Sequence, residues 1–322
     1  MQLSKWLRAA FVVALLAPVL AVAQAWPTKP VRLVSPFPAG GGTDAFARPL
    51  AAQLSQQLGQ QFVIDNRGGA GGTIGADHVA HQPADGYTFL VGAVHHTIAV
   101  SVYAKLGYDL EKDLVPVTLV ALVPNVVVVH PKVPVRTLKE LVDYAKANPN
   151  KLNYASAGNG TSHHLAGELF KTLTGAPINH VPYKGAGPAM QDLLGGQVDM
   201  MFDGMGTSAA QIRGQRLRPL AVATNARVSA FPDIPTAAEA GVSGYNVSTW
   251  YGIWAPAGTP PDIVAKLQQE VAKAMQTPTI RDVWAQQAAD LGGNAPAEFG
   301  AFVKGEIRKW AEVVKAANVR ID

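Results

Sequence analysis

The sequence predicts an α/β protein with two doubly wound αβ domains and a central cleft, and three features lead to this prediction. Short β-branched runs alternate with helix-periodic segments through most of the 322 residues, which is typical of parallel sheets covered by helices. Glycine-rich loops join strands to the helices that follow them. A new αβ series starts after residue 124, and an aromatic strand at Tyr245–Ala255 leads back to the first half. Two crossings are suited to a hinged clamp, with domain 1 at 26–124 and 248–322 and domain 2 at 125–247.

The first 25 residues have the features of a secretory signal peptide and are set apart from the fold. Lys5 and Arg8 form a basic start, Ala9–Ala17 is apolar, and Ala23–Ala25 is a small-x-small cleavage signal. The chain has no cysteine, so its core must be stable without disulfides. We expect a mature chain that begins near Trp26 and is exported to the periplasm.

Strands and helices alternate in the first half of the mature chain. The ligand in such sheets lies at the carboxyl ends of the strands, which are followed here by Ser35–Gly42, Asp65–Gly72 and Ala93–Thr97. The expected elements are a strand at Val31–Val34, a helix with Phe46, Leu50, Leu54 and Leu58 at helical spacing, a strand at Gln61–Ile64, a helix at Thr73–Gln82 and a strand at Tyr87–Gly92.

The second half repeats the alternation and ends in helices. Thr137–Glu140 is a capping-box pattern that starts a helix ending at Asn148–Pro149. Three closing helices are expected to pack back on domain 1. The other expected elements are strands at Asn125–His130, Lys151–Ala157, Ile178–Tyr183, Val198–Asp203 and Arg218–Thr224, and helices at Thr161–Thr174, Pro188–Leu194, Pro261–Gln276, Thr279–Ala289 and Phe299–Ala317.

The loop after the first strand has the features of an anion site. Residues 40–42 are glycines, and Thr43 or Asp44 is suited to cap the next helix. Free amides at a helix start form an electropositive pocket, and the loop itself contains no lysine or arginine. The predicted ligand-binding residues here are Phe37, Ala39, Gly40, Gly41, Gly42, Thr43 and Asp44.

A second loop of this kind follows the strand at Lys151–Ala157. Serine and threonine hydroxyls lie where the next helix should begin, and the atoms that cap a helix are the same atoms that bind an anion. Asp203 ends a strand at the predicted cleft, where it could cap a helix or accept from a ligand amine, hydroxyl or water. The further predicted ligand-binding residues are His95, His96, Ser156, Gly158, Asn159, Thr161, Ser162 and Asp203.

Other functions fit the sequence less well. Gly40–Ala45 matches a dinucleotide fingerprint with Asp65 downstream, but five residues separate the strand from the first glycine. The glycine loop at Asn66–Gly75 could cradle phosphate, although close strand–helix packing explains it too. Gly160–His164 approaches a nucleophile elbow but lacks the final glycine.

Metals, cofactors and nucleic acids are also disfavoured. The eight histidines include no set with persuasive metal-ligand spacing. The basic residues are dispersed along the chain, unlike those of a nucleic-acid-binding surface. We therefore expect neither a metal nor a cofactor and no nucleic-acid partner.

With both loops in view, the chain resembles the Bug family, the exported solute receptors of the tripartite tricarboxylate transporter type. The matching segments are in order along nearly the whole mature chain. They are Trp26-Pro27, Pro30–Val34, Pro36–Asp44, Asn66–Gly72, Tyr154–Gly160, Val181–Gly185, Gly195–Asp199, Trp250–Gly252 and Ala255–Gly258. Two departures are Pro49 inside the first helix, which removes a hydrogen bond, and Arg67-Gly68-Gly69 in place of the family's Arg-Pro-Gly.

The resemblance implies a Venus-flytrap receptor of periplasmic binding protein architecture. Such a receptor binds a small carboxylated metabolite through backbone amides and water and delivers it to membrane permease subunits. We expect a monomer without catalytic activity. Two alternatives remain open, an exported serine hydrolase that uses Ser162 and a ligand-sensing partner of a membrane signalling protein. The identity of the carboxylate is not readable from the sequence, because selectivity depends on side chains and waters around the amides.

Overall fold

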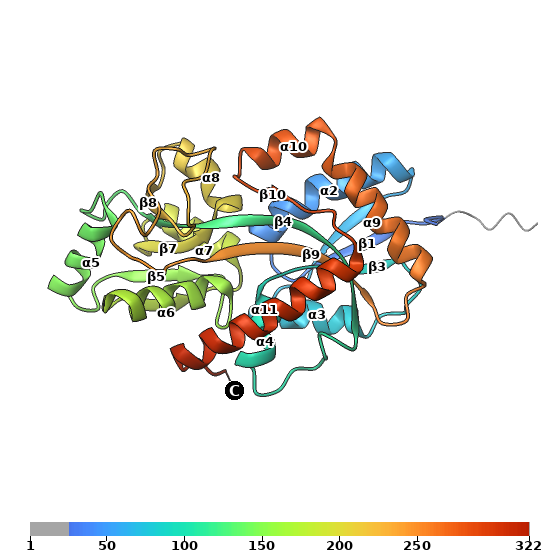
Figure 1. The fold of residues 1–322 in the computed structure, drawn as a ribbon, viewed down its shortest axis with the longest axis horizontal. Coiled ribbons are helices and arrows are strands. Elements are labelled where there is room, and N and C mark those ends of the chain that lie inside the picture. Colours follow the sequence, from blue (N-terminus) through green and yellow to red (C-terminus); the bar gives the residue numbers. More distant parts are fainter. Residues whose placement is uncertain (1–25, 322) are drawn as a thin grey trace, which may run out of the picture.

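The computed structural model describes residues 26–321, so the predicted signal peptide lies outside the described residues. The strands join in the order β2-β1-β3-β9-β4-β7-β5-β6, with β10 and β8 also paired to β4. Helices cover both faces of this curled sheet (Figure 1). The α/β fold with two αβ halves is as the alternation predicts.

The first half contains a parallel arrangement of β2, β1 and β3, joined to β9 in the antiparallel direction. Each parallel strand is followed by a helix, as the periodicity predicts. The elements are β1 (Val31–Ser35), α2 (Gly42–Leu58), β2 (Phe62–Asn66), the short 3-10 helix η2 (Ala70–Gly72), α3 (Thr73–Ala80), β3 (Thr88–Ala93), α4 (His95–Val102) and β4 (Leu114–Val129).

The second half repeats this plan, with β6, β5 and β7 parallel and β4 antiparallel to β7 and β8. The chain then returns through β9 and ends in helices. The elements are α5 (Leu138–Ala147), β5 (Asn153–Ser156), α6 (Ser162–Thr174), β6 (Asn179–Pro182), α7 (Ala186–Leu194), β7 (Met200–Gly204), α8 (Met205–Arg213), β8 (Arg218–Val222), β9 (Ser248–Pro256), α9 (Pro261–Met275), α10 (Pro278–Ala285), β10 (Asp290–Leu291) and α11 (Pro296–Ala317).

One long strand, β4, runs through both halves beside β9 (Figure 1). We expected a strand to begin only at Asn125, because Pro124 and Pro131 enclose the apolar run at residues 125–130. Instead, the register of β4 against β9 shifts just after Pro116, and Pro124 is the last residue paired with β9. From Asn125 onward β4 pairs with β7. The prolines therefore occur where the ladder is irregular or changes partner.

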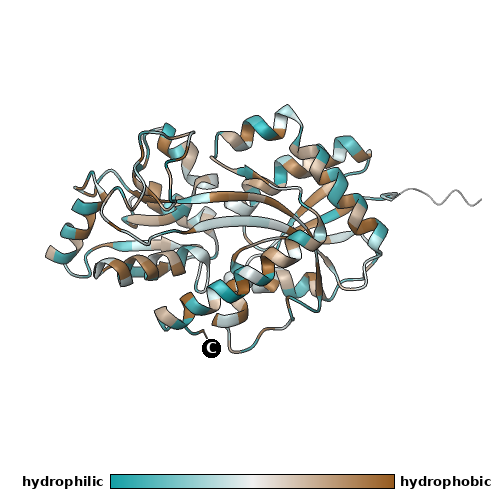
Figure 2. Ribbon diagram, viewed as in Figure 1, coloured by the Kyte–Doolittle hydropathy of each residue, from teal (hydrophilic) through white to brown (hydrophobic). Residues whose placement is uncertain are grey.

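The closing helices cover the first half of the sheet, and the last one extends further. Helix α9 packs on α2 and β4, and α10 packs on α2. Helix α11 contacts α4 and also reaches α6 in the second half. Figure 2 shows apolar residues on the central strands and on the inner faces of the helices, with polar residues outside. No helix within residues 26–321 is long and apolar enough to cross a membrane.

Helices α4 and α8 were not expected. The α4 sequence, His95–Val102, is rich in β-branched residues and is buried around most of its circumference, so it shows no amphipathic period. As a consequence, His95 and His96 belong to the first turn of a helix and do not end a strand. Their side chains point in different directions, which decides their roles at the site.

Candidate functional site

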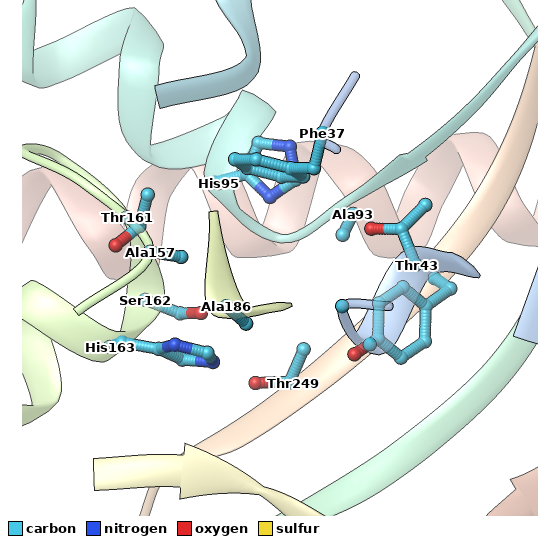
Figure 3. Close-up of a pocket in the computed structure, with 13 residues that line it drawn as sticks. Phe37, Thr43, Ala93, His95, Ala157, Thr161, Ser162, His163, Ala186 and Thr249 are labelled. Carbon is cyan, nitrogen blue, oxygen red and sulfur yellow. The ribbon is translucent and has the colours of Figure 1, made fainter. Parts of the chain in front are cut away.

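Helix starts from both halves of the sheet converge on one cavity. Helices α2 and α4 approach it from the first half, and α6 and α7 from the second (Figures 1 and 3). The space between the lining atoms, open solvent included, amounts to about 360 Å³. The lining residues are Phe37, Gly41, Gly42, Thr43, Ala93, His95, Ala157, Thr161, Ser162, His163, Ala186, Thr249 and Tyr251.

The first glycine loop presents unpaired amides to this cavity. Helix α2 begins at Gly42, and its N-cap is Gly41, which corrects the expectation of Thr43 or Asp44 as the cap. Because Gly41 has no side chain, no capping group covers the free amides at the start of α2. Within residues 26–321 the amide groups of Gly41, Gly42 and Thr43 have no acceptor. These are the orphan donors that every helix start leaves.

The second loop is capped as predicted. The Thr161 hydroxyl accepts from the amide of His164 at 3.5 Å and donates to the carbonyl oxygen of Gly158 at 2.7 Å. Within the described chain, the amides of Ser162 and His163 have no acceptor. Two opposed helix starts therefore direct free amides into one cavity, and the dipoles of α2 and α6 add to the positive potential there.

The two halves touch on either side of the cavity. A β-carbon placed on Gly187 of α7 would lie 2.7 Å from the carbonyl oxygen of Ala39, so the backbones of the two loops are in direct contact. On the other side, the Tyr103 hydroxyl donates to the carbonyl oxygen of Asn159 at 3.4 Å. The structure is thus a closed clamp around the cavity.

The cavity wall has imidazoles but no side-chain cation. Among residues 26–321 no lysine or arginine lines it. Burial, with His96 and His163 nearby, holds the pKa of His95 well below its ordinary value. Burial also lowers the pKa of His163, although the Asp203 carboxylate acts in the opposite direction. Both rings are therefore neutral near pH 7, so they add no positive charge to the cavity.

Asp44 stabilises the first loop without lining the cavity. Its carboxylate accepts from Arg48 Nε at 2.6 Å, from the Gly40 amide at 3.2 Å and from Asn66 Nδ2 at 3.2 Å. Burial alone would raise the pKa of Asp44, but the hydrogen bonds from Arg48, Gly40 and Asn66 lower it overall. Asp44 thus fixes the backbone turn before α2.

The other predicted residues divide into three groups. Those on the cavity are Phe37, Gly41, Gly42, Thr43, His95, Thr161 and Ser162. Those on an adjoining groove beside η2 are Gly158 and Asn159, with Phe37 shared. Those outside the cavity lining are Ala39, Gly40, Asp44, His96, Ser156 and Asp203.

The residues outside the lining have other contacts. His96 is buried against Trp254 and Tyr108, and burial lowers its pKa to about 3. The Ser156 hydroxyl accepts from the Gly158 amide at 3.1 Å and lies 2.6 Å from His180 Nε2, so it shapes the second loop. No group of three or more histidine, cysteine or acidic side chains within 26–321 is placed to hold a metal ion.

Sequence reasoning missed several cavity residues. Thr249 and Tyr251 come from β9, whose aromatic pattern predicted a strand but not the face that each residue occupies. His163 lies next to the predicted Ser162, and its position one residue further along the first turn of α6 brings its ring to the cavity (Figure 3). The residues missed are Ala93, Ala157, His163, Ala186, Thr249 and Tyr251.

The fold and the site together show two αβ halves that meet around one cavity bordered by free backbone amides. The family model described as the tripartite tricarboxylate transporter family receptor matches residues 46–319. The chain belongs to this receptor family, and the resemblance to Bug receptors is confirmed.

Solved structures of similar proteins agree with this assignment. The R. palustris protein Rpa4515, solved with adipate, is 41% identical with a TM-score of 0.89 over 92% of this chain and 99% of that chain. The periplasmic binding protein BugD is 38% identical with a TM-score of 0.88 over 92% and 99%. MatC from Rhodopseudomonas palustris, solved with malate, is 36% identical with a TM-score of 0.86 over 90% and 100%. The periplasmic binding protein architecture is therefore confirmed, and these neighbours are binding proteins.

Proposed function

We propose that this protein is a periplasmic receptor that captures a small carboxylate and delivers it to the permease subunits of a tripartite tricarboxylate-type transporter. One carboxylate group would accept hydrogen bonds from the free amides of both loops. The observation that carries this proposal is the convergence of the α2 and α6 starts on a cavity without a lysine or arginine among its described lining residues. A carboxylate is one of the anions that such a pocket stabilises, and the family neighbours favour it among them.

The family neighbours support this ligand class. Rpa4515 was solved with adipate and MatC with malate, and both compounds are dicarboxylates. We propose that the mature chain acts as a monomer and that the predicted signal peptide at residues 1–25 directs its export.

The hinge of the clamp would lie where the sheet changes partners. β4 leaves β9 after Pro124, and β9 begins at Ser248. We therefore place domain 1 at 26–124 and 248–322 and domain 2 at 125–247. Rotation about these two crossings would separate Gly187 from Ala39 and open the cavity to ligand.

Geometry argues against the hydrolase alternative. Within the described residues the Ser162 hydroxyl makes no hydrogen bond to an imidazole, whereas an activated serine needs a base within reach. A sensing role would use the same binding site and differ only in the membrane partner. Capture of a carboxylate is common to transport and sensing.

Thermal unfolding of the mature protein with matched acids and neutral analogues tests the proposal. Malate, succinate and adipate would be compared with their diamides at equal concentration. A ligand present at 100 times its dissociation constant adds about 2.7 kcal/mol to the free energy of unfolding. We expect at least one acid to raise the melting temperature and its diamide to leave it unchanged.

Two results would contradict the proposal. One is a full panel of acids without any shift, and the other is a diamide that stabilises the protein as strongly as its acid. Replacement of an exposed side chain remote from the cavity, such as His81→Leu, provides the matched control, because it should leave every ligand-induced shift intact.

A further inference from the structure

Hydrogen-bond acceptors lie along, and directly behind, the side of the cavity formed by α6 and β9. Asp203, at the end of β7, is fully buried, and its Oδ2 atom accepts from Thr207 and from Ser208 Oγ at 2.6 Å. Its Oδ1 atom has no hydrogen-bond partner among the described residues, and it lies 3.5 Å from His163 Nε2. A buried carboxylate oxygen without a donor is costly to leave unpaired.

His163 extends this acceptor surface into the cavity. Its ring projects between Ser162 and Thr249 (Figure 3), with 6% of the residue exposed. A proton on Nε2 is favoured by the adjacent Asp203 charge, and in the neutral ring this leaves a lone pair on Nδ1. That nitrogen is buried and has no partner within residues 26–321.

Thr249 adds a third acceptor. Its hydroxyl donates to Asn125 Oδ1 at 2.8 Å, so the same oxygen can only accept from a molecule in the cavity. His163 and Thr249 come from different elements and present these acceptors to the cavity, and Asp203 lies behind His163, outside the cavity lining, where its charge favours the proton on Nε2. No lysine or arginine among the described lining residues balances them.

We propose that His163, Asp203 and Thr249 make this pocket selective for carboxylates that also carry a hydrogen-bond donor, either a hydroxyl or an ammonium group. This inference rests on the proposed function, in which the loop amides hold the carboxylate. The donor on the ligand satisfies the acceptors opposite the amides. A plain second carboxylate at that position meets lone pairs and the Asp203 charge, which disfavours it.

Binding measured by calorimetry on sets of acids of equal length tests this selectivity. One set is succinate, malate and aspartate, and another is glutarate, 2-hydroxyglutarate and glutamate. The wild-type protein should bind a hydroxy or amino acid about tenfold or more tightly than the unsubstituted acid of its set. A wild-type protein that binds the unsubstituted acid equally well at both lengths overturns the inference.

Variants assign the selectivity to the three residues. His163→Leu keeps bulk but removes the ring acceptor, so the ratio should fall severalfold towards one while the unsubstituted acid still binds. Thr249→Val is the second variant and should lower the same ratio. Unchanged ratios in both folded variants contradict the inference, and His81→Leu should retain the wild-type ratio.

Asp203→Asn distinguishes the two donors. Loss of the carboxylate charge should weaken an ammonium ligand much more than a hydroxyl ligand. Equal binding of all acids by the wild-type protein as well as by every variant refutes the selectivity but leaves carboxylate capture intact. If no acid binds to the wild-type protein, the proposed function fails and this inference fails with it.

Discussion

Substitution of Gly42 by alanine is a direct test of how β9 and the first loop fit together. A β-carbon at Gly42 would lie 2.1 Å from the Tyr251 hydroxyl oxygen and 3.2 Å from the carbon that carries it. Ordinary contacts begin at 3.4 Å, so the hydroxyl must move by about 1.3 Å. Tyr251 is 4% exposed and is stacked on Phe46 with ring centroids 4.8 Å apart, which leaves it little freedom.

We expect Gly42→Ala to lower the free energy of unfolding by about 1–3 kcal/mol, the usual cost of overpacking. Because the overlap is with one hydroxyl, Tyr251→Phe should relieve most of it. Chemical denaturation of the wild type, both single variants and the double variant gives the coupling energy. The double variant should be more stable than Gly42→Ala alone. A fully stable Gly42→Ala protein, or a double variant in which the two effects simply add, would refute this geometry.

Three further predictions concern the stability of other elements. Gly305 lies in α11, and a β-carbon there meets nothing within 4 Å. Gly305→Ala should therefore raise the free energy of unfolding by up to about 1 kcal/mol, measured by chemical denaturation, without changing ligand affinity. A destabilised variant would show that the space around Gly305 is not open. Thr161→Ala removes the α6 cap, so it should lower the free energy of unfolding by about 0.5–2 kcal/mol and weaken carboxylate binding. A variant with wild-type stability and wild-type affinity would count against the role of this cap. Burial raises the pKa of Glu270, but hydrogen bonds from Lys273 and Lys266 outweigh burial and lower it to about 2. A lowered carboxylate pKa stabilises the fold above the unfolded-state pKa of about 4.5 and loses that contribution as the pH falls towards 2. Between pH 4.5 and pH 2 the Glu270→Gln variant should therefore lose less unfolding free energy than the wild type. Identical stability profiles of the two proteins over this pH range would contradict the ion pairs of Glu270.

Local patterns were sufficient to predict the αβ alternation and the two glycine-containing loops that border the cavity. The Thr161 cap and the Gly175 end of α6 are set by residues adjacent in sequence, so propensity and periodicity locate them. The cap of α2 was predicted less well, because both Thr43 and Asp44 are good capping residues. The side-chain contacts of Asp44 decide this case, since Asp44 bonds to Arg48 one turn further along α2 and to Asn66 at the end of β2.

The sequence predicted less well which side chains line the cavity. Tyr251 and Thr249 both face the cavity from β9 because of the strand's register between β3 and β4, and register depends on partners distant in sequence. The role of His163 depends on its distance to Asp203, which is 40 positions later in the chain. His96 shows the opposite error, because only the rotation of α4 turns it away from the cavity.

A crystal structure of the mature protein with a bound dicarboxylate or hydroxydicarboxylate measures the central claim most directly. We predict that the oxygens of one carboxylate group lie about 2.7–3.2 Å from amide nitrogens at the start of α2 and at the start of α6. Electron density for the ligand beside Lys184 in the adjoining groove, with the amides of Gly42 and Ser162 bound only to water, would contradict it.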